Sequence, residues 1–224
     1  MPSPIGHSLM GYIIYGIGVR SVAGQHGRLI PLYLLAANAA DVDFVPGLLI
    51  GDPNRYHHGI SHSIGFAILF ALVSSLFLFL LKRDVAWWWR NFAILFCLYC
   101  SHIGLDYFAR DGSFPYGVPV FWPVSGEYYI APMALFLDIR RSSAAIEFLP
   151  SLFSLYNLRA VAVEVLLLFP FVLLILCGLP GGGVFRRATE LLPMTRLLNK
   201  ISPPVVHGGE TPRRESNPSR SNKR

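Results

Sequence analysis

Residues 64–81 read IGFAILFALVSSLFLFLL, an uncharged and almost entirely apolar run. At a rise of about 1.5 Å per residue, a helix of this length crosses most of a hydrocarbon core that is roughly 30 Å thick. Soluble domains seldom contain so long an apolar run, so this stretch predicts a transmembrane helix. The rest of the chain is therefore expected to fold in or beside a lipid bilayer.

Four further apolar segments flank this run, at residues 8–19, 29–40, 91–108 and 161–178. The first two are short and could be tilted or partly embedded helices, or the two arms of a helical hairpin. The chain has 224 residues, of which 53% are hydrophobic and 14% charged, so it is too apolar for an ordinary soluble domain and too short for several domains. We expect an all-α, polytopic integral membrane bundle with about five hydrophobic segments.

The organisation expected is one membrane-embedded domain over residues 1–200 and a disordered basic tail over 201–224. The tail is rich in Pro, Gly, Ser, Asn and Arg and shows no apolar periodicity. The net charge is +6 and the pI about 9.4. Because this excess is concentrated in short connections and in the tail, attraction to anionic lipid headgroups explains it and no nucleic-acid partner is expected.

The basic residues also predict an orientation for a multi-pass protein of the cell membrane. They fall between the first two segments, between the third and fourth, and after the fifth: Arg20, Arg28, Lys82, Arg83, Arg90, Arg186 and Arg187. Under the positive-inside rule these connections and the C-terminus face the cytoplasm. The other ends of the segments are then external.

Histidine and aspartate recur at those other ends. The set consists of His7, Asp41, Asp43, His57, His58, His62, His102 and Asp106, and only His26 and His207 among the seven histidines lie outside it. Imidazole nitrogen and carboxylate oxygen are the ligands that zinc and other divalent first-row metals accept, and ionisable groups beside lipid are costly enough to be functional candidates. The sequence therefore predicts one metal site at the external surface.

Spacing supports shared ligation within this set. His102 and Asp106 are four residues apart, so on a continuous helix both project from one face. His58 and His62 have the same spacing. We expect the helix to begin within this stretch, which would let His57 reach the site from the helix cap.

Asp41 and Asp43 stand two residues apart, just beyond an apolar segment. An extended turn there would aim one carboxylate at a metal and leave the other to orient a histidine. Other readings stay open when each piece is taken alone: Asp41 and Asp43 as a helix cap, His102 and Asp106 as a hydrogen-bonded pair, and His7 as an interfacial histidine.

Four motifs in this order carry a family resemblance. They are DVD at residues 41–43, YHHGISHS at 56–63, SHIGLD at 101–106 and GVPVFWP at 117–123. Together with the early His7 they resemble the YdjM-type family of membrane-bound, metal-dependent hydrolases over about residues 1–180. Ala40 replaces the usual proline, and His58 stands where the family usually has an arginine that would suit a substrate phosphate.

The resemblance implies a set of metal ligands: His7, Asp41, Asp43, His57, His62, His102 and Asp106. It also implies one or two divalent ions, with zinc expected first and manganese as the alternative. The family is similar to zinc-dependent phospholipase C enzymes, which suggests phosphodiester chemistry. Glu164, an isolated acid in the last segment, could reach the site, and Arg140 and Arg141 could hold an anionic substrate.

The function expected is metal-dependent hydrolysis of a phosphodiester or ester in a lipid or another membrane-associated substrate. A carboxylate from Asp41, Asp43 or Asp106 would accept the proton of the activated water. A metal transporter would need ligands along a path, which residues 64–81 do not offer. A closed, purely structural metal site is the other alternative. Serine hydrolysis is disfavoured because the serines beside the histidines lack a Gly-x-Ser-x-Gly elbow.

Overall fold

The computed structural model describes residues 1–18, 30–112 and 115–177. This part of the chain is helical, with two isolated β-bridges and no strand. The helices are α1 (Pro4–Gly18), α2 (Ile30–Ala37), α3 (Phe44–Leu49), α4 (Ile64–Lys82), α5 (Val85–Tyr107), α6 (Ala145–Leu152) and α7 (Leu155–Leu176), with short 3-10 helices η2 (Ala39–Asp43) and η3 (Ile60–His62). The all-α prediction is confirmed, whereas the predicted disordered tail lies outside the described residues.

Among the described helices, α4 and α7 are long and apolar enough to cross a membrane. A third span is possible if α2 and the η2–α3 segment, which bend by 59° at their junction, form one broken crossing. Helix α1 has 15 residues and is only about 22 Å long. Helix α5 is longer, but its own sequence contains polar residues near both ends. Two or three candidate spans therefore stand in place of the five hydrophobic segments predicted, and five crossings are not confirmed.

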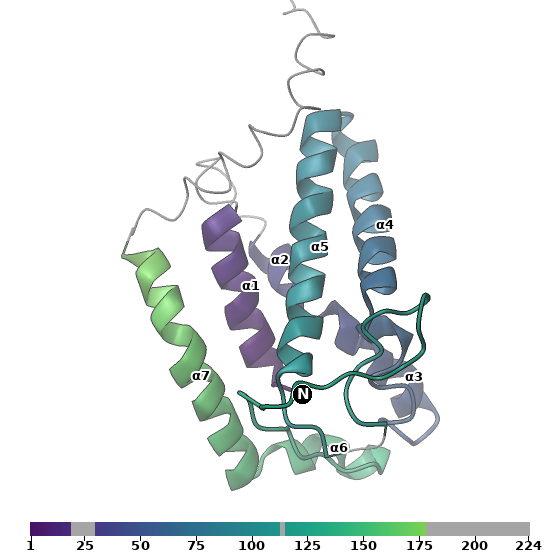
Figure 1. The fold of residues 1–224 in the computed structure, drawn as a ribbon, viewed down its shortest axis with the longest axis vertical. Coiled ribbons are helices and arrows are strands. Elements are labelled where there is room, and N and C mark those ends of the chain that lie inside the picture. The colour runs from purple at the N-terminus through teal and green to yellow at the C-terminus, as the bar shows by residue number, and fades with distance from the viewer. Residues whose placement is uncertain (19–29, 113–114, 178–224) are drawn as a thin grey trace, which may run out of the picture.

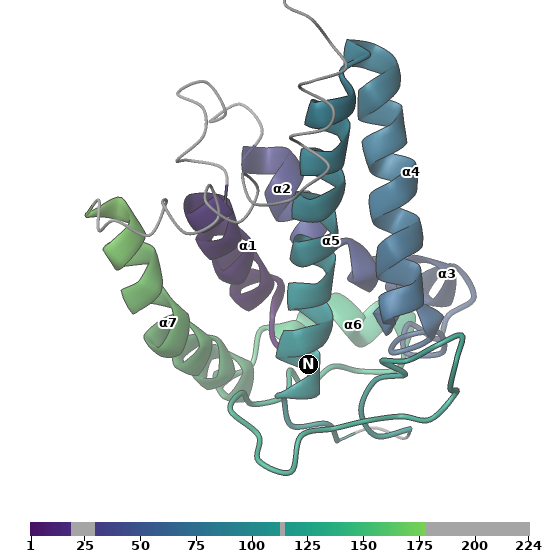
Figure 2. The same cartoon turned by 45° about the horizontal axis from the view of Figure 1, so that its top comes forward.

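Helices α4 and α5 form an antiparallel pair, and α1 and α7 lie on the other side of α5 (Figure 1; Figure 2). In the turn between α4 and α5, Arg83 caps the C-terminus of α4 with a left-handed φ of 56°. Asp84 follows, and its side chain caps the N-terminus of α5. Buried Tyr33 and Leu98 fill the space between α1, α2 and α5. Helix α5 is thus the central element of the bundle.

The long connections and α6 gather at one end of this bundle, the lower end in Figure 1. There the loop at residues 117–123 holds the first turn of α4. Val120 O accepts from the Ile64 amide at 2.9 Å, and Trp122 O accepts from the Gly65 amide at 3.2 Å. These bonds satisfy backbone amides that the first turn of a helix leaves unpaired. The loop therefore fixes the position of the first turn of α4, just after His62.

Two features of the fold differ from the prediction. Helix α6 was not expected, because Pro150 and its shortness hide it in the sequence. Helix α7 begins at Leu155, six residues before the predicted segment, because Asn157 and Arg159 interrupt the apolar pattern there. Asn157 is nevertheless buried: its amide group bonds both the N–H and the carbonyl of Arg140. These bonds tie the start of α7 to the lower loops.

Candidate metal centre

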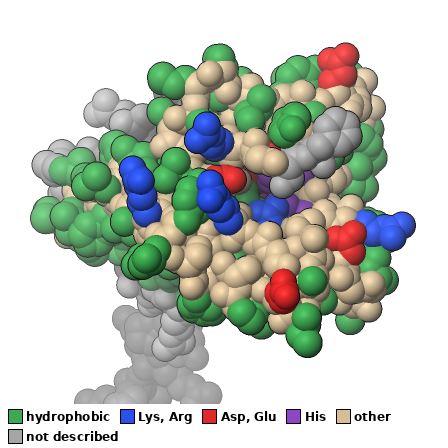
Figure 3. Space-filling model, turned by 90° about the horizontal axis from the view of Figure 1, so that it is seen from below, with side chains coloured by type: hydrophobic (Ala, Val, Ile, Leu, Met, Phe, Trp, Pro, Cys, Tyr) green, Lys and Arg blue, Asp and Glu red, His purple; other side chains and the backbone are tan. Residues whose placement is uncertain are grey.

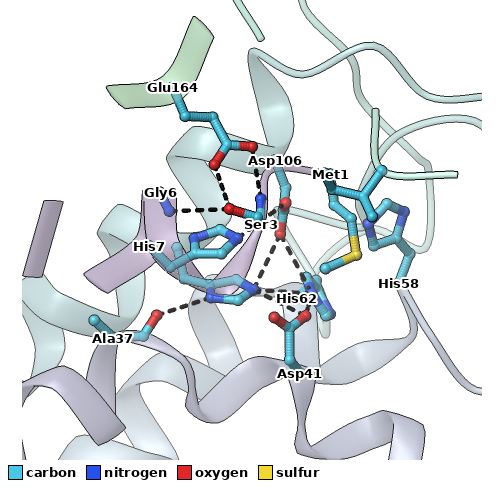
Figure 4. Close-up of polar contacts among 12 residues, drawn as sticks. Met1, Ser3, Gly6, His7, Ala37, Asp41, His58, His62, Asp106 and Glu164 are labelled. Carbon is cyan, nitrogen blue, oxygen red and sulfur yellow. Dashed lines mark hydrogen bonds and ion pairs between the residues drawn. The ribbon is translucent and has the colours of Figure 1, made fainter. Parts of the chain in front are cut away.

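The predicted histidines and aspartates meet in one buried cluster, of which Figure 4 shows His7, Asp41, His58, His62 and Asp106. The contributors are α1 with His7, η2 with Asp41 and Asp43, the segment up to and including η3 with His57, His58 and His62, and α5 with His102 and Asp106. The side chains of His7, His62, His102 and Asp106 are almost completely shielded from solvent. Residues up to 99 positions apart in sequence are therefore neighbours.

Two imidazole nitrogens of this cluster lie at the spacing of metal ligands from each other and from a carboxylate oxygen of both Asp41 and Asp106. His102 Nε2 lies 3.3 Å from His62 Nε2, 3.2 Å from Asp106 Oδ2 and 3.4 Å from Asp41 Oδ1. His62 Nε2 lies 3.3 Å from Asp106 Oδ2 and 3.7 Å from Asp41 Oδ1. Ligand bonds of about 2.0–2.1 Å in a tetrahedral zinc site place the ligand atoms about 3.3 Å apart. The arrangement fits such an ion.

The lack of hydrogen bonds to the Asp41 and Asp106 carboxylates also fits a metal ion at this site. Both oxygens of Asp41 and both oxygens of Asp106 are buried and make no hydrogen bond among the described residues; Asp41 Oδ1 and the two Asp106 oxygens face ring nitrogens of His7, His62 and His102 at 3.2–3.7 Å. Burying an ionised carboxylate without a partner is expensive, so native structures pair it with donors or with a cation. A divalent ion placed among these oxygens and the facing imidazole nitrogens would remove that cost.

The neutral ring of His102 is held in the tautomer that a metal ligand needs. Its Nδ1 lies 2.9 Å from the carbonyl oxygen of Ala37, which can only accept a hydrogen bond. The ring proton of neutral His102 must therefore be on Nδ1, which leaves the lone pair of Nε2 facing the cluster. A backbone carbonyl that fixes the tautomer in this way is a common partner of metal-binding histidines.

Asp43 holds His62 in the same way from the opposite side. His62 Nδ1 lies 3.2 Å from Asp43 Oδ2, and the Ser61 hydroxyl donates to the same oxygen at 2.7 Å. Asp43 Oδ1 lies 3.0 Å from His57 Nδ1, whose N–H it can accept. Asp41 thus faces the centre, while Asp43 orients His57 and His62. This is the arrangement expected from the sequence, with one carboxylate directed at a metal and the other holding a histidine. The prediction of an extended turn was wrong, because both residues lie on the 3-10 helix η2.

A second ion would find further ligands beside the first. His7 stacks on His102 with 3.7 Å between ring centroids, and its Nε2 lies 3.6 Å from Asp106 Oδ1. Neither ring nitrogen of His7 has a hydrogen-bond partner in the described structure. His7, His102 and Asp106 form one group with metal-ligand spacing, and Asp41, Asp43 and His57 form another. The ligand supply therefore suffices for one ion or two.

The segment before α4 is a turn and not the helix start that was predicted. His58 has a left-handed φ of 59°, and only η3 follows before α4 begins at Ile64. This backbone turns the His58 ring towards Asp111, whose Oδ2 lies 3.3 Å from Nδ1. Burial lowers the pKa of His58, and the bond to Asp111 offsets this only in part. His58 therefore lies at the edge of the centre and is paired with an acid outside the predicted set.

Electrostatics in the cluster favours positive charge at its middle. Burial alone would lower the pKa of His62, but the carboxylates of Asp106, Asp41 and Asp43 outweigh burial and raise this pKa well above its usual value. For His57, burial prevails over the bond from Asp43 and lowers the pKa. The three carboxylates thus create a strongly negative pocket, which a divalent cation would neutralise.

Glu164 does not reach the cluster; it fixes the start of α1. Its Oε1 accepts from the Ser3 amide at 2.7 Å and its Oε2 accepts from the Ser3 hydroxyl (Figure 4). A Cβ at Gly6 would lie 2.7 Å from this Oε2, so glycine permits the close approach. Because His7 follows within the same turn of α1, Glu164 positions this histidine through α1 and has no direct role at the centre.

Several neighbours of the centre could not be recognised from the sequence. Ala37 acts through its carbonyl, which leaves no side-chain signal. The Tyr99 hydroxyl donates to Ser61 O at 2.9 Å, and Phe44 stacks on His57 with 3.9 Å between centroids. Asp111 could have been noticed as an acid soon after the Ser101–Asp106 motif.

The family model for the YdjM inner membrane protein matches residues 1–182. The chain belongs to this family. The match includes the whole His and Asp cluster and all described helices, and it ends before the basic tail. No curated protein and no solved structure matches the chain. Membership confirms the predicted resemblance and, with the apolar helices, a location in the membrane.

Proposed function

We propose that this member of the YdjM family is a membrane-bound, metal-dependent hydrolase whose centre binds one or two divalent ions, zinc before manganese. The observation that supports it most strongly is that His62 Nε2 and His102 Nε2 lie 3.2–3.7 Å from buried carboxylate oxygens of both Asp41 and Asp106, which make no hydrogen bond in the described structure. Such an ion, when bound, lowers the pKa of water and polarises a phosphoryl or carbonyl oxygen. A fully closed structural site would leave no reason for the surplus ligands His7 and His57.

The chain's own residues then have distinct tasks. His62, His102, Asp41 and Asp106 would hold the first ion, and His7 would contribute to a second. Of the three carboxylates predicted to accept a proton, the Asp106 side chain is completely buried, and both oxygens of Asp43 are engaged by His57, Ser61 and His62. Asp41 differs from both: its side chain is 13% exposed, although its two oxygens are themselves buried, and its Oδ2 has no hydrogen-bond partner among the described residues. We therefore assign the proton acceptor to Asp41.

An apolar pocket next to the centre supports a lipid substrate. It has a volume of about 630 Å³ and lies between α2, α4 and α5, with Leu35, Phe70 and Phe77 among its lining residues. Ala39 and Val42, on either side of Asp41 in η2, also line it. The pocket and the metal centre thus share η2 as a wall, which suits a molecule with a hydrocarbon chain and a hydrolysable head.

The test of the proposed function is metal-dependent hydrolysis by the purified protein. Protein in detergent is incubated with mixed phospholipid micelles, and release of water-soluble product is followed before chelation, after it, and after zinc or manganese is added back. We expect product release to stop on chelation and to return with the metal. Activity that survives complete metal removal would refute a metal-dependent hydrolase.

We further propose that the centre faces the external side and that the α4–α5 turn is cytoplasmic. The centre and this turn lie at opposite ends of the two helices (Figure 1), and the turn carries Lys82 and Arg83, with Arg90 in the first part of α5. Variants with a single cysteine at Asp84 or at Gly126, in an otherwise cysteine-free chain, should react with an impermeant thiol reagent from opposite sides. Labelling of both from one side would contradict this orientation.

A further inference from the structure

Arg141 is fixed beside the metal centre through two of the centre's own neighbours. Its Nε donates to Asn54 Oδ1 at 2.7 Å, and its guanidinium carbon lies 5.0 Å from the centroid of the Phe44 ring. Asn54 O accepts from the His57 amide at 3.3 Å, and Phe44 stacks on the His57 ring. The guanidinium is therefore held at a defined place next to His57 and does not move freely on the surface.

This guanidinium keeps hydrogen-bond donors that the protein does not use. Nε is engaged by Asn54, and Nη1 donates to Ile139 O at 3.3 Å. Within the described ranges no acceptor engages Nη2, and no carboxylate lies within ion-pair distance of Arg141. Burial lowers the pKa of Arg141, while the carboxylates of Asp41 and Asp111 act in the opposite direction, so the charge is in electrostatic range of the centre. Arginine stays protonated throughout.

Figure 3 views the molecule from below and shows a hollow in which histidine is visible, with arginine side chains and acidic side chains around it. Arg140, next in sequence, is engaged differently: its guanidinium lies 3.7 Å from the centroid of the Tyr156 ring. Arg141 therefore differs from its neighbour in lying at a fixed position beside the histidines.

We propose that Arg141 is the anion-binding residue of this centre and that its ligand carries a phosphate group. The planar fork of a guanidinium matches two phosphate oxygens, whereas an uncharged carboxylic ester offers no such partner. Two divalent ions would outweigh the three aspartates of the centre and make the hollow attractive to an anion. This inference rests on the proposed function, which it narrows from esters in general to phosphate-bearing substrates.

The test measures phosphate binding to full-length, zinc-loaded protein in detergent after excess zinc is removed by dialysis. Isothermal titration calorimetry is carried out with inorganic phosphate and with dihexanoylphosphatidic acid below its micelle concentration, for the wild type, Arg141→Gln, Arg141→Lys and Arg140→Gln. Arg141→Gln should weaken binding roughly ten- to a hundredfold, the range expected for losing hydrogen bonds between charged groups. Arg141→Lys should be intermediate, and Arg140→Gln should bind as the wild type does.

The outcomes separate this inference from the function on which it rests. A wild-type protein that holds no metal contradicts the metal centre itself. Zinc-loaded wild type that binds neither probe, or Arg141→Gln that binds them unchanged, overturns the role of Arg141 alone, as does loss of zinc in Arg141→Gln. If Arg141 is confirmed, at least tenfold tighter binding of the lipid than of inorganic phosphate identifies a lipid headgroup, and equal affinity identifies free phosphate.

Discussion

Replacing His102 or Asp106 by alanine is expected to remove most of the metal from the protein. His102 Nε2 and Asp106 Oδ2 lie 3.2 Å apart, and each is within 3.3 Å of His62 Nε2, so either change removes a corner of the candidate site. Loss of a residue that only orients a ligand typically weakens metal binding about 10–100-fold, and loss of a ligand should exceed that. Elemental analysis of the detergent-purified variants measures the metal-to-protein ratio.

The control for this prediction is His207→Ala, because His207 lies in the basic tail and outside the clustered set. It should retain the wild-type metal content. Circular dichroism and size-exclusion chromatography show whether the other variants remain folded. A well-folded His102→Ala protein with unchanged metal content would remove His102 from the ligand set.

Asp43→Asn is expected to keep the fold and much of the metal but to lose turnover. The amide retains an oxygen that can accept from His57, but it places an N–H₂ donor where the Ser61 hydroxyl and His62 Nδ1 now meet a carboxylate oxygen. The His62 tautomer and ring orientation are then no longer enforced, so metal affinity should fall about 10–100-fold, as for other residues that orient a ligand, and turnover should fall even when zinc fills the site because the ligand is misplaced. Turnover on phospholipid micelles at saturating zinc is the measurement.

Asp52→Asn provides the matched control for this change, because Asp52 is an exposed acid nine residues further along the same region of the chain. It should match the wild type in turnover and in metal content. If the metal is only structural, Asp43→Asn should instead lower thermal stability without any activity to lose. Full turnover by metal-loaded Asp43→Asn would show that Asp43 does not hold the reactive arrangement.

The convergence of the histidines and aspartates could be anticipated because helix connectivity leaves little choice. Once residues 64–81 and 91–108 are adjacent helices, the start of the first and the end of the second must meet, which places His62 near His102 and Asp106. The spacing of His102 and Asp106 also places both on one helix face, as observed on α5. Local periodicity together with chain order was sufficient for this part of the site.

Other features depended on contacts that the sequence does not encode locally. The 3-10 helix η2 follows an apolar segment without any turn signal of its own, and the left-handed backbone at His58 is rare for a residue other than glycine. Glu164 looked like a candidate for the centre because it is an acid in an apolar run, but its partner is Ser3, at the other end of the matched chain. Long-range partners of this kind become visible only in the folded protein.

The number of membrane crossings was also beyond the sequence pattern. Apolar composition identified the segments, but length and polarity decide which can span a bilayer, and the described part of α1 has only 15 residues. Helix α5 contains His102 and Asp106, and the cost of these groups in lipid is reduced by facing the other ligands inside the bundle. The functional residues themselves thus obscure the hydropathy signal of the central helix.

The most direct test of the metal centre is anomalous scattering from crystals of the purified protein, combined with elemental analysis of the same preparation. The account predicts a zinc or manganese peak between His62 Nε2, His102 Nε2, Asp41 and Asp106, with any second peak beside His7 or His57. Protein purified without chelator and supplied with zinc that shows no peak among these residues, or a peak only elsewhere, would contradict it.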